Sequence, residues 1–420
     1  MTILSSALIV LTGFLASAQG EIQREGAPST LPAQTSQGSG VQTTPLLRCA
    51  PPTSWPTSVP IPGGGGRRFV DVPYWSGTTQ TLDVYLPLEW NGGGDRQTIV
   101  YFHGGGGFSG DKYNPSIVEF FAGMVRDGYP VVSVNTTLAP PNCSTGSSPQ
   151  SVQEARAAID FVRRASAPGM PAGSLAGQDV CLPNCIVVVG SSFGALQAAQ
   201  IGVLDGANDG SYFNPGIPKG NYRADLCVIV SGPTDLYDWG ANGACPPSEC
   251  YGAPYNVSFP DSGACGGLSG WSSGYPTLSV SDWAAAFGGG LPNGCWPSEN
   301  TLACQWGSAC SSVTPPALPS NILTGNAFAD FSPQNWIDPG DSAFYLLQGR
   351  CDPLVPFSQS ESFFDALLLA GVPVWANHMA SKGHGIQAIG GLLTPAEAVV
   401  EVQAAIGIWA GSDPSNRPGY

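Results

Sequence analysis

A serine between glycines is the first group in this 420-residue chain that could do chemistry. It lies in the segment 190–194, Gly-Ser-Ser-Phe-Gly, after the aliphatic run 186–189 and before the helix-forming stretch 195–199. A strand, a tight turn and a helix in this order present the middle hydroxyl of Gly-x-Ser-x-Gly at the tip of the strand. The turn needs a strained backbone, for which the flanking glycines leave room. We therefore predict that Ser192 is a nucleophile, with Ser191 as the alternative if the turn is shifted by one residue.

A glycine-rich loop is the second element that such a nucleophile requires. Residues 103–107 read His-Gly-Gly-Gly-Gly and follow a predicted strand. Because glycine lets the backbone approach a substrate closely, its N–H groups can stabilise the oxyanion of a tetrahedral intermediate. We predict that Gly105, Gly106 and the N–H of Phe193 form this oxyanion hole, although the fourth glycine leaves the register open by one residue. His103 is expected to hold the loop. A phosphate-binding loop would need Lys-Ser or Lys-Thr after the glycines, and neither follows.

A base for the serine must come from one of only three histidines, unless a lysine serves instead. His384 lies in a glycine-rich loop after the last predicted strand. His378 lies at the end of that strand, where a structural role is expected. We therefore predict that His384 is the base.

The acid that orients this histidine is expected after the preceding strand. Asp352 follows the aliphatic stretch 343–349 and begins Asp-Pro-Leu-Val-Pro. Asp235, which follows another predicted strand, is an alternative, whereas Asp341 precedes its strand and would lie at the wrong edge. A carboxylate in this position holds the imidazole tautomer and stabilises the imidazolium while staying ionised. We therefore predict a Ser192, His384 and Asp352 triad.

Alternating strand and helix patterns have to bring these residues together. Several of the strands are continuous apolar runs, which are typical of strands buried on both faces of a parallel sheet. The alternation predicts an α/β fold with a mostly parallel central sheet and helices on both faces. Strands are predicted at 68–74, 80–86, 98–103, 131–135, 185–190, 226–231, 343–349 and 373–378, and helices at 116–127, 151–165, 194–205, 358–370 and 395–410.

Two segments do not follow this alternation. Residues 19–62 are rich in Gln, Ser, Thr, Pro and Gly and are expected to form a flexible arm. Residues 237–335 contain six cysteines and are expected to form a disulfide-rich insertion, or cap, after the sixth strand. Its aromatic residues either line a substrate pocket or fill a small core of their own, and an inert surface insertion is the third possibility. The catalytic domain then comprises 63–236 and 336–420.

The N-terminal residues and the cysteines predict secretion. Residues 1–18 contain a short apolar run and end in Ala-Ser-Ala, which indicates a signal peptide; the run is too short for a stable membrane span of about 20 residues. The 12 cysteines then indicate disulfides. Sequons at Asn135, Asn142 and Asn256 fit glycosylation of a secreted protein.

The charge of the chain limits its partners. The net charge of −15 argues against nucleic acid and against anionic membrane surfaces. No Cys-x-x-Cys pair is present, and no metal or organic cofactor is expected. The oligomeric state is left open.

Taken together, the motifs resemble carboxylesterases and lipases of the α/β-hydrolase fold, and the hormone-sensitive-lipase-like branch most of all. The resemblance covers about 68–236 and 340–410. It rests on the His-Gly-Gly-Gly loop, the Gly-x-Ser-x-Gly turn, Asp-Pro-Leu-Val-Pro and Gly-His-Gly. The fourth glycine, Ser-Ser-Phe in the turn and the cysteine-rich insertion depart from that branch and leave the substrate open.

This resemblance implies hydrolysis of a small or lipid-like carboxylic ester through an acyl-enzyme, without a cofactor. Two alternatives use the same residues or the same fold. One is a peptide or amide hydrolase with the same triad, and the other is a catalytically silent binding protein, because a fold does not determine a function.

Overall fold

The structure is a computed structural model, in which the chain divides into two units, residues 1–46 and 47–420. All residues that the structure describes lie in the second unit. The predicted signal peptide, most of the arm and nearly all of the insertion lie outside them, so those expectations stay predictions. The described residues are 58–75, 80–88, 90, 96–107, 110–138, 150–166, 185–204, 222–235, 332–350, 352, 355, 357–380, 382–387 and 391–412.

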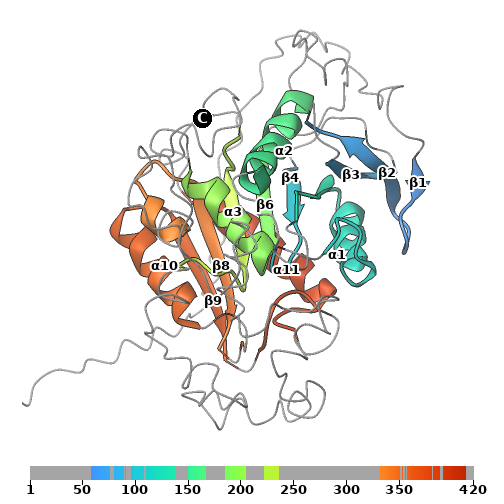
Figure 1. The fold of residues 1–420 in the computed structure, drawn as a ribbon. Helices are drawn as coiled ribbons and strands as arrows, with labels where there is room; N and C mark the ends of the chain where they lie inside the picture. The colour runs from blue at the N-terminus through green and yellow to red at the C-terminus, as the bar shows by residue number, and fades with distance from the viewer. Residues whose placement is uncertain are drawn as a thin grey trace, which may run out of the picture. The chain divides into compact units, whose positions relative to one another are not determined.

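The described strands form one nine-stranded sheet (Figure 1). They are β1 (Val59–Pro60), β2 (Gly66–Pro73), β3 (Thr81–Pro87), β4 (Thr98–Phe102), β5 (Val131–Val134), β6 (Ile186–Ser191), β7 (Leu226–Val230), β8 (Ala343–Gly349) and β9 (Val374–Met379). Their order in the sheet is β1-β2-β3-β5-β4-β6-β7-β8-β9. In this order, neighbouring strands are parallel from β5 onward, that is among β5, β4, β6, β7, β8 and β9. The strands β1, β2 and β3 lie at one edge and pair antiparallel. The predicted, mostly parallel α/β sheet is therefore confirmed.

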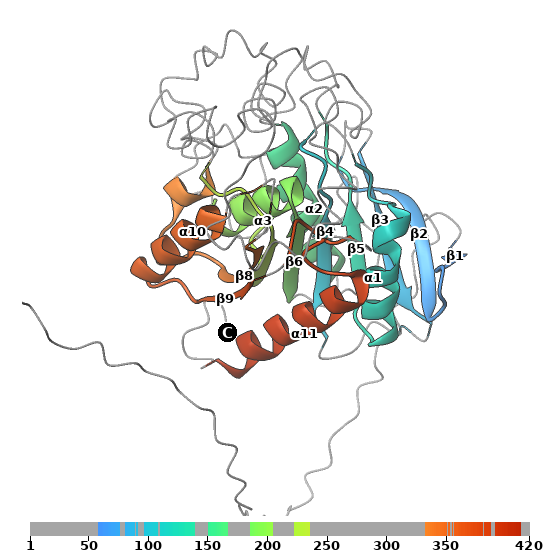
Figure 2. The ribbon, with the colours of Figure 1, turned by 90° about the horizontal axis from the view of Figure 1, so that it is seen from below.

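Helices cover both faces of this sheet, as the view in Figure 2 shows. One face carries α1 (Pro115–Arg126) and α11 (Pro395–Gly411), and the other carries α2 (Gln150–Ser166), α3 (Phe193–Val203) and α10 (Phe357–Leu369). The short 3-10 helix η4 (Pro333–Trp336) precedes β8. Each predicted helix begins and ends within two residues of the observed one.

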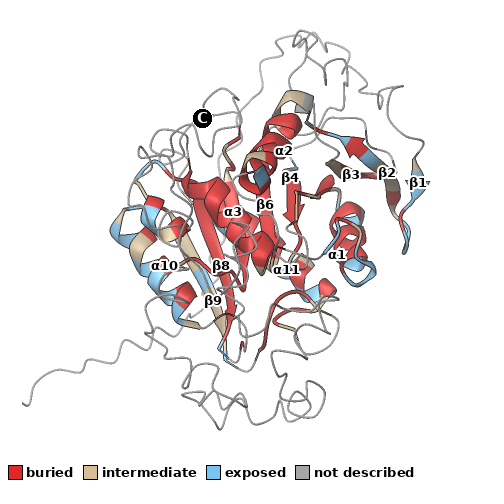
Figure 3. Ribbon diagram, in the orientation of Figure 1, coloured by how far each residue is buried: buried red, intermediate tan, exposed pale blue. Residues whose placement is uncertain are grey.

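The central strands are buried on both sides (Figure 3). In β6, Ile186 and Val188 belong to the core under α2, α3 and α10, whereas Val187 and Val189 belong to the core under α1 and α11. Successive side chains of a strand point to opposite faces, so a strand between two helical layers has no polar face. This is the physical reason for the unbroken apolar runs in the sequence.

The first strand lies where the sequence predicted a flexible arm. Val59 pairs with Arg68 of β2, and Ile61 is buried. Three glycines, 63–65, form the connecting turn with φ of 87°, 80° and 88°. A two-residue strand next to a glycine turn has no periodicity to detect, so the expected end of the arm at residue 62 was too late.

The described residues bear on few of the features linked to secretion. Cys227 in β7 is buried as a free thiol, and burial raises its pKa. Except for Cys185 and Cys227, the cysteines lie outside the described residues, so the disulfides stay a prediction. No helix in the described part of the chain combines the length and apolar character needed to cross a membrane.

One of the three sequons falls on a described residue. Asn135 follows β5, and its Nδ2 donates to Asp111 Oδ2 at 2.9 Å while its Oδ1 accepts from Lys112 N at 2.5 Å. A glycosylated Nδ2 keeps one N–H that can donate, so glycosylation at Asn135 stays a prediction. Asn142 and Asn256 lie outside the described residues.

Loss of the cap of α11 is expected to destabilise the fold. Thr394 and Glu397 form a capping box, in which Glu397 N donates to Thr394 Oγ1 at 3.2 Å and Thr394 N donates to Glu397 Oε2 at 2.8 Å. Thr394→Ala should lower the free energy of unfolding by about 1 kcal/mol, because the N–H of Glu397 loses its acceptor. Urea unfolding measures this change. Thr394→Ser keeps the hydroxyl and should stay close to wild type; equal losses in both variants would contradict the capping role.

Candidate active site

Ser192 lies in a sharp turn between β6 and α3. Its φ of 57° and ψ of −120° are rare for a residue with a side chain and cost about 1–3 kcal/mol. The turn is held to the neighbouring strand by a hydrogen bond of 2.9 Å from Ser192 N to Val230 O. Ser191 has ordinary strand conformation and is buried, whereas Ser192 is only partly buried. The structure therefore has Ser192, and not Ser191, at the strained position.

The two glycines of the motif are required by close backbone packing. A Cβ atom at Gly190 would overlap with the carbonyl of Gly194, and one at Gly194 would overlap with the carbonyl of Phe102 at the end of β4. The first turn of α3 therefore lies directly against β4 and β6. This packing explains why the pattern needs glycine at both positions.

The predicted base and acid are hydrogen-bonded to each other. His384 Nδ1 lies 2.8 Å from Asp352 Oδ2, and both residues are buried. The carboxylate is held further by Gln348 Nε2, which donates to Oδ2 at 3.0 Å, and by Val355 N, which donates to Oδ1 at 2.9 Å. When Nδ1 donates its proton to the carboxylate, Nε2 is the nitrogen that can accept a proton. Gln348 was not predicted, because a glutamine in a strand carries no signal of its partner.

The alternative groups are placed elsewhere. Asp341 lies just before β8, at the opposite end of that strand from Asp352. His378 lies on the edge strand β9, where its Nε2 is 3.2 Å from Ser360 Oγ of α10. Of the described carboxylates, Asp352 is therefore the one hydrogen-bonded to His384.

Two serine hydroxyls hold the backbone that follows His384. Gly385 N donates to Ser231 Oγ at 3.0 Å, and Ile386 N lies 3.4 Å from Ser191 Oγ. Ser191 ends β6 and Ser231 follows β7, so the loop of His384 is attached on the strand that carries the turn and on its neighbour. Ser231 is fully buried and has a φ of 54°. Neither contact could be predicted, since Gly385 and Ser231 lie 154 residues apart.

The glycine loop forms a turn at the carboxyl end of β4. The φ values of Gly105, Gly106 and Gly107 are 118°, 64° and 80°. Gly104 packs against the turn of Ser192, where a Cβ atom would lie 3.1 Å from Ser192 Cβ. Phe193 is the first residue of α3, and helix N-termini present unpaired N–H groups. The three predicted oxyanion donors thus belong to segments beside Ser192, and their role stays a prediction.

His103 holds the start of this loop. Its Nδ1 lies 2.7 Å from Gly104 O, and Gly110 passes so close to the ring that a side chain there would overlap with it. Burial lowers the pKa of His103, so the neutral ring is favoured. A neutral ring with its proton on Nδ1 donates to Gly104 O, which fits the expected structural role.

A surface hollow of about 460 Å³ lies apart from this site, between α10 and β9. Its lining includes carboxylates and a histidine. Among the described residues, however, no three His, Cys, Asp or Glu side chains are grouped so that they could hold a metal ion. The lining residues are Ser358, Glu361, Ser362, Phe364, Asp365 and His378.

Known families and structures agree with the fold. Residues 82–253, less than half of the chain, match the family model BD-FAE, of the esterase and lipase type of α/β-hydrolases. A truncated carbohydrate esterase from gut microbiota superposes with a TM-score of 0.52 and 17% identity, over 85% of this chain and 100% of that one. The chain therefore has an α/β-hydrolase-like fold.

Two further solved structures superpose with lower TM-scores. A bifunctional GH43-CE protein of Bacteroides eggerthii has a TM-score of 0.49 and 19% identity, over 82% of this chain and 35% of that one. Butyrate-bound Est2, a thermophilic esterase of Thermogutta terrifontis, has a TM-score of 0.47 and 16% identity, over 83% and 95%. No curated protein sequence matches the chain.

Removal of the Ser231 hydroxyl is expected to loosen the His384 loop. Ser231→Gly suits the φ of 54°, so the variant should fold. Its rate of reaction with a fluorophosphonate should fall roughly tenfold or more, because His384, the predicted base, is less well oriented. Ser342→Ala is the matched control, since Ser342 is also buried and donates to Ala224 O at 2.7 Å, but before β8. A wild-type reaction rate in Ser231→Gly would refute the positioning role.

The burial of His103 is expected to make the fold less stable in mild acid. Its folded-state pKa lies below the value of about 6.5 in the unfolded chain. Below that pH the unfolded state binds the proton more readily, so the free energy of unfolding decreases as the pH falls. Urea unfolding at several pH values should show a smaller decrease for His103→Asn than for wild type. Identical pH dependence in the two proteins would contradict the assignment.

Proposed function

Because residues 82–253 match a family of the esterase and lipase type, we propose that this chain hydrolyses carboxylic esters through an acyl-enzyme on Ser192. The observation that carries the proposal is the buried hydrogen bond of 2.8 Å between His384 and Asp352. The loop of His384 is attached through Ile386 N to Ser191, directly before the strained turn of Ser192. A histidine that is oriented by a carboxylate can activate a serine hydroxyl for attack when its Nε2 reaches that hydroxyl.

Acylation is the first half of the proposed reaction. Ser192 Oγ attacks the ester carbonyl carbon while His384 Nε2 takes the hydroxyl proton, and the ionised Asp352 stabilises the resulting imidazolium. The carbonyl oxygen becomes an oxyanion, which the N–H groups of Gly105, Gly106 and Phe193 would stabilise. His384 then gives its proton to the leaving alkoxide oxygen. The bond to that oxygen breaks, the alcohol departs and the acyl group stays on Ser192.

Deacylation returns the protein to its first state. His384 takes a proton from water, and the water oxygen attacks the acyl carbon. The same N–H groups stabilise the second oxyanion. Its collapse releases the carboxylic acid, and Ser192 Oγ recovers its proton from His384. Every proton in the cycle therefore passes through one imidazole.

The proposal predicts that hydrolysis depends on Ser192. Wild type should hydrolyse p-nitrophenyl acetate and react with a fluorophosphonate, whereas Ser192→Ala should lose the labelling and at least about 1,000-fold in kcat/KM, because the attacking oxygen is gone. Ser342→Ala, which removes a buried hydroxyl away from the site, is the control and should keep both activities.

A substrate panel separates this proposal from its alternatives. An acetylated sugar and a long-chain lipid ester test whether the alcohol is a carbohydrate, as in the gut carbohydrate esterase of similar fold, or a lipid. Faster cleavage of an aminoacyl anilide than of any ester would indicate an amide hydrolase. If wild type neither reacts with the fluorophosphonate nor cleaves any ester or amide of the panel, the proposal fails and the silent binding protein becomes the favoured alternative.

We also propose that the protein is secreted, as its first 18 residues predict. The N-terminal sequence of the mature protein from culture medium tests this. A mature chain that begins near residue 19 supports secretion, and retention of the full-length chain in cells contradicts it.

A further inference from the structure

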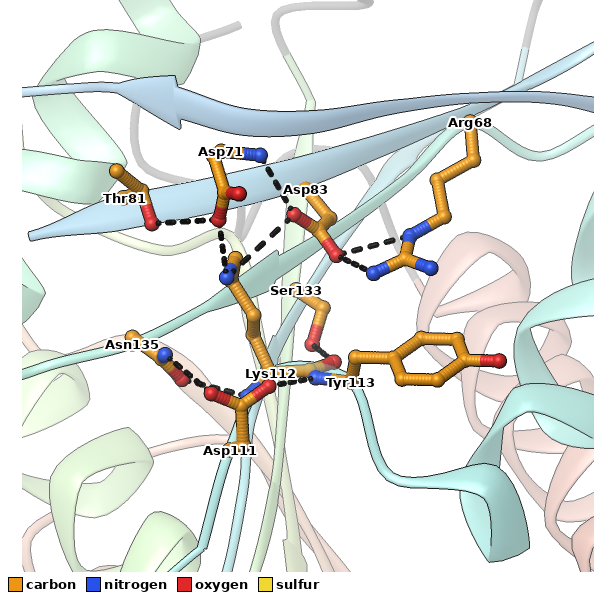
Figure 4. Close-up of polar contacts among 9 residues, drawn as sticks. All are labelled: Arg68, Asp71, Thr81, Asp83, Asp111, Lys112, Tyr113, Ser133 and Asn135. Carbon is orange, nitrogen blue, oxygen red and sulfur yellow. Dashed lines mark hydrogen bonds and ion pairs between the residues drawn. The ribbon is translucent and has the colours of Figure 1, made fainter. Parts of the chain in front are cut away.

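A buried lysine lies a few residues beyond the glycine turn. Lys112 has a relative exposure of 6%, and its ammonium lies between two carboxylates, 2.7 Å from Asp71 Oδ1 and 3.7 Å from Asp83 Oδ1 (Figure 4). Lysine is almost never buried unless it is paired. The reaction proposed above has no step for this lysine, so its burial needs another explanation.

The main chain at Lys112 is fixed by β5 and the residue that follows it. Lys112 N donates to Asn135 Oδ1 at 2.5 Å, and Ser133 Oγ donates to Lys112 O at 2.8 Å. Asn135 Nδ2 also donates to Asp111 Oδ2 at 2.9 Å (Figure 4). The backbone N–H, the carbonyl and the side chain of Lys112 are therefore all bound.

The carboxylates around the ammonium are themselves held in place by β2 and β3. Asp83 is fully buried; its Oδ2 accepts from Arg68 Nε at 2.9 Å, and its Oδ1 accepts from Asp71 N at 2.9 Å. Asp71 lies at a shift in the β2–β3 register and has a φ of 58°, a region that favours glycine. The strained backbone and the ion pair occur together at Asp71, and strain of this kind persists where surrounding contacts enforce it.

A chain of contacts connects the segment that contains Lys112 to Ser192. Gly110 lies against the ring of His103, and that ring is hydrogen-bonded to Gly104 O at 2.7 Å. Gly104 in turn packs against Ser192 Cβ. The start of the glycine turn is thus held by His103 and packs against Gly110, which lies two residues before Lys112. Glycines have no side chains to fix a turn, so its shape depends on these flanking contacts.

We propose that Lys112 is a positioning residue for the oxyanion hole. Its ion pairs with Asp71 and Asp83 hold residues 110–112, and Gly110 packs against the start of the glycine turn. The fixed turn keeps the N–H groups of Gly105 and Gly106 where the oxyanion develops, which is how preorganised donors stabilise a transition state. This inference rests on the function proposed above.

The direct test is Lys112→Met, which keeps the length of the side chain and removes its charge. kcat for p-nitrophenyl acetate should fall roughly 10- to 100-fold while KM changes by less than about threefold, because displaced donors weaken the transition state more than the bound ester. The affinity for a boronic acid, whose adduct with Ser192 resembles the tetrahedral intermediate, should fall by a similar factor.

Arg163→Met is the matched control for the loss of a paired cation. Arg163 is bound to Asp225 at 3.2 Å and to the carbonyl of Arg223, before β7 and so at the opposite edge of the sheet from Ser192. The control should lower Tm without a comparable loss of kcat. If the ion pairs of Lys112 have only a structural role, Lys112→Met and Arg163→Met should have the same kcat when their Tm is lowered equally.

A second variant keeps the test valid if Lys112→Met does not fold. Asp71→Gly removes the nearer carboxylate, whose side chain is 63% exposed, and glycine suits the φ of 58°. kcat should fall roughly threefold to tenfold at nearly constant KM. In a foldable double variant with Lys112→Met no further loss is expected, because Asp71 acts through Lys112.

Two results would overturn this inference without affecting the proposed function. They are wild-type kcat in Asp71→Gly or Lys112→Met, and a kcat loss in Arg163→Met equal to that in Lys112→Met. Both leave ester hydrolysis by the wild-type protein intact. A wild-type protein that neither hydrolyses the ester nor reacts with a fluorophosphonate instead refutes the proposed function, and this inference with it.

Discussion

Parallel pairing of the central strands is the constraint on which the site depends. Because β6, β7 and β8 run in one direction, Ser192, Ser231 and Asp352, which follow them, are brought to the same edge of the sheet. The glycine turn follows β4, which is parallel to β6, so it reaches that edge as well. Asp341 shows the contrast, because it precedes β8 and therefore lies at the opposite edge of the sheet from Asp352.

Backbone strain marks the places where this edge is held together. Within the described residues, three residues other than glycine have a positive φ: Asp71, Ser192 and Ser231. Ser192 carries the hydroxyl, Ser231 binds the loop of His384, and Asp71 binds Lys112. Unfavourable backbone conformations persist only where surrounding contacts enforce them. The three strained residues therefore lie where the apolar sheet meets the polar groups at one of its edges.

The antiparallel strands at the other side of the sheet complete this arrangement. The segment that matches the BD-FAE model contains Asp83 and Lys112, whereas Asp71 and Arg68 of β2 precede it. Arg68 also stacks on Tyr113, the neighbour of Lys112, with its guanidinium 3.9 Å from the ring centre. A strand outside the matched segment, β2, therefore contributes contacts to residues 112 and 113, which follow the glycine turn in the chain.

Local patterns in the sequence were sufficient for the elements and indicated the candidate chemical groups. The apolar run of β6 and the glycines on both sides of Ser192 are neighbours in the chain, so propensity and spacing predict a strand, a turn and a helix there. The scarcity of histidine reduced the choice of base, and the order of the strands indicated Asp352. The same reasoning failed for β1, whose two residues have no pattern of their own.

Only the tertiary structure decided which distant polar groups meet. The bond from Gly385 to Ser231, the Gln348 contact to Asp352 and the carboxylates around Lys112 depend on strand order and on the register shift in β2. A one-residue change of register would turn these side chains to the other face of the sheet. Composition and periodicity report local conformational preference and burial, whereas hydrogen bonds across the sheet require the positions of both partners.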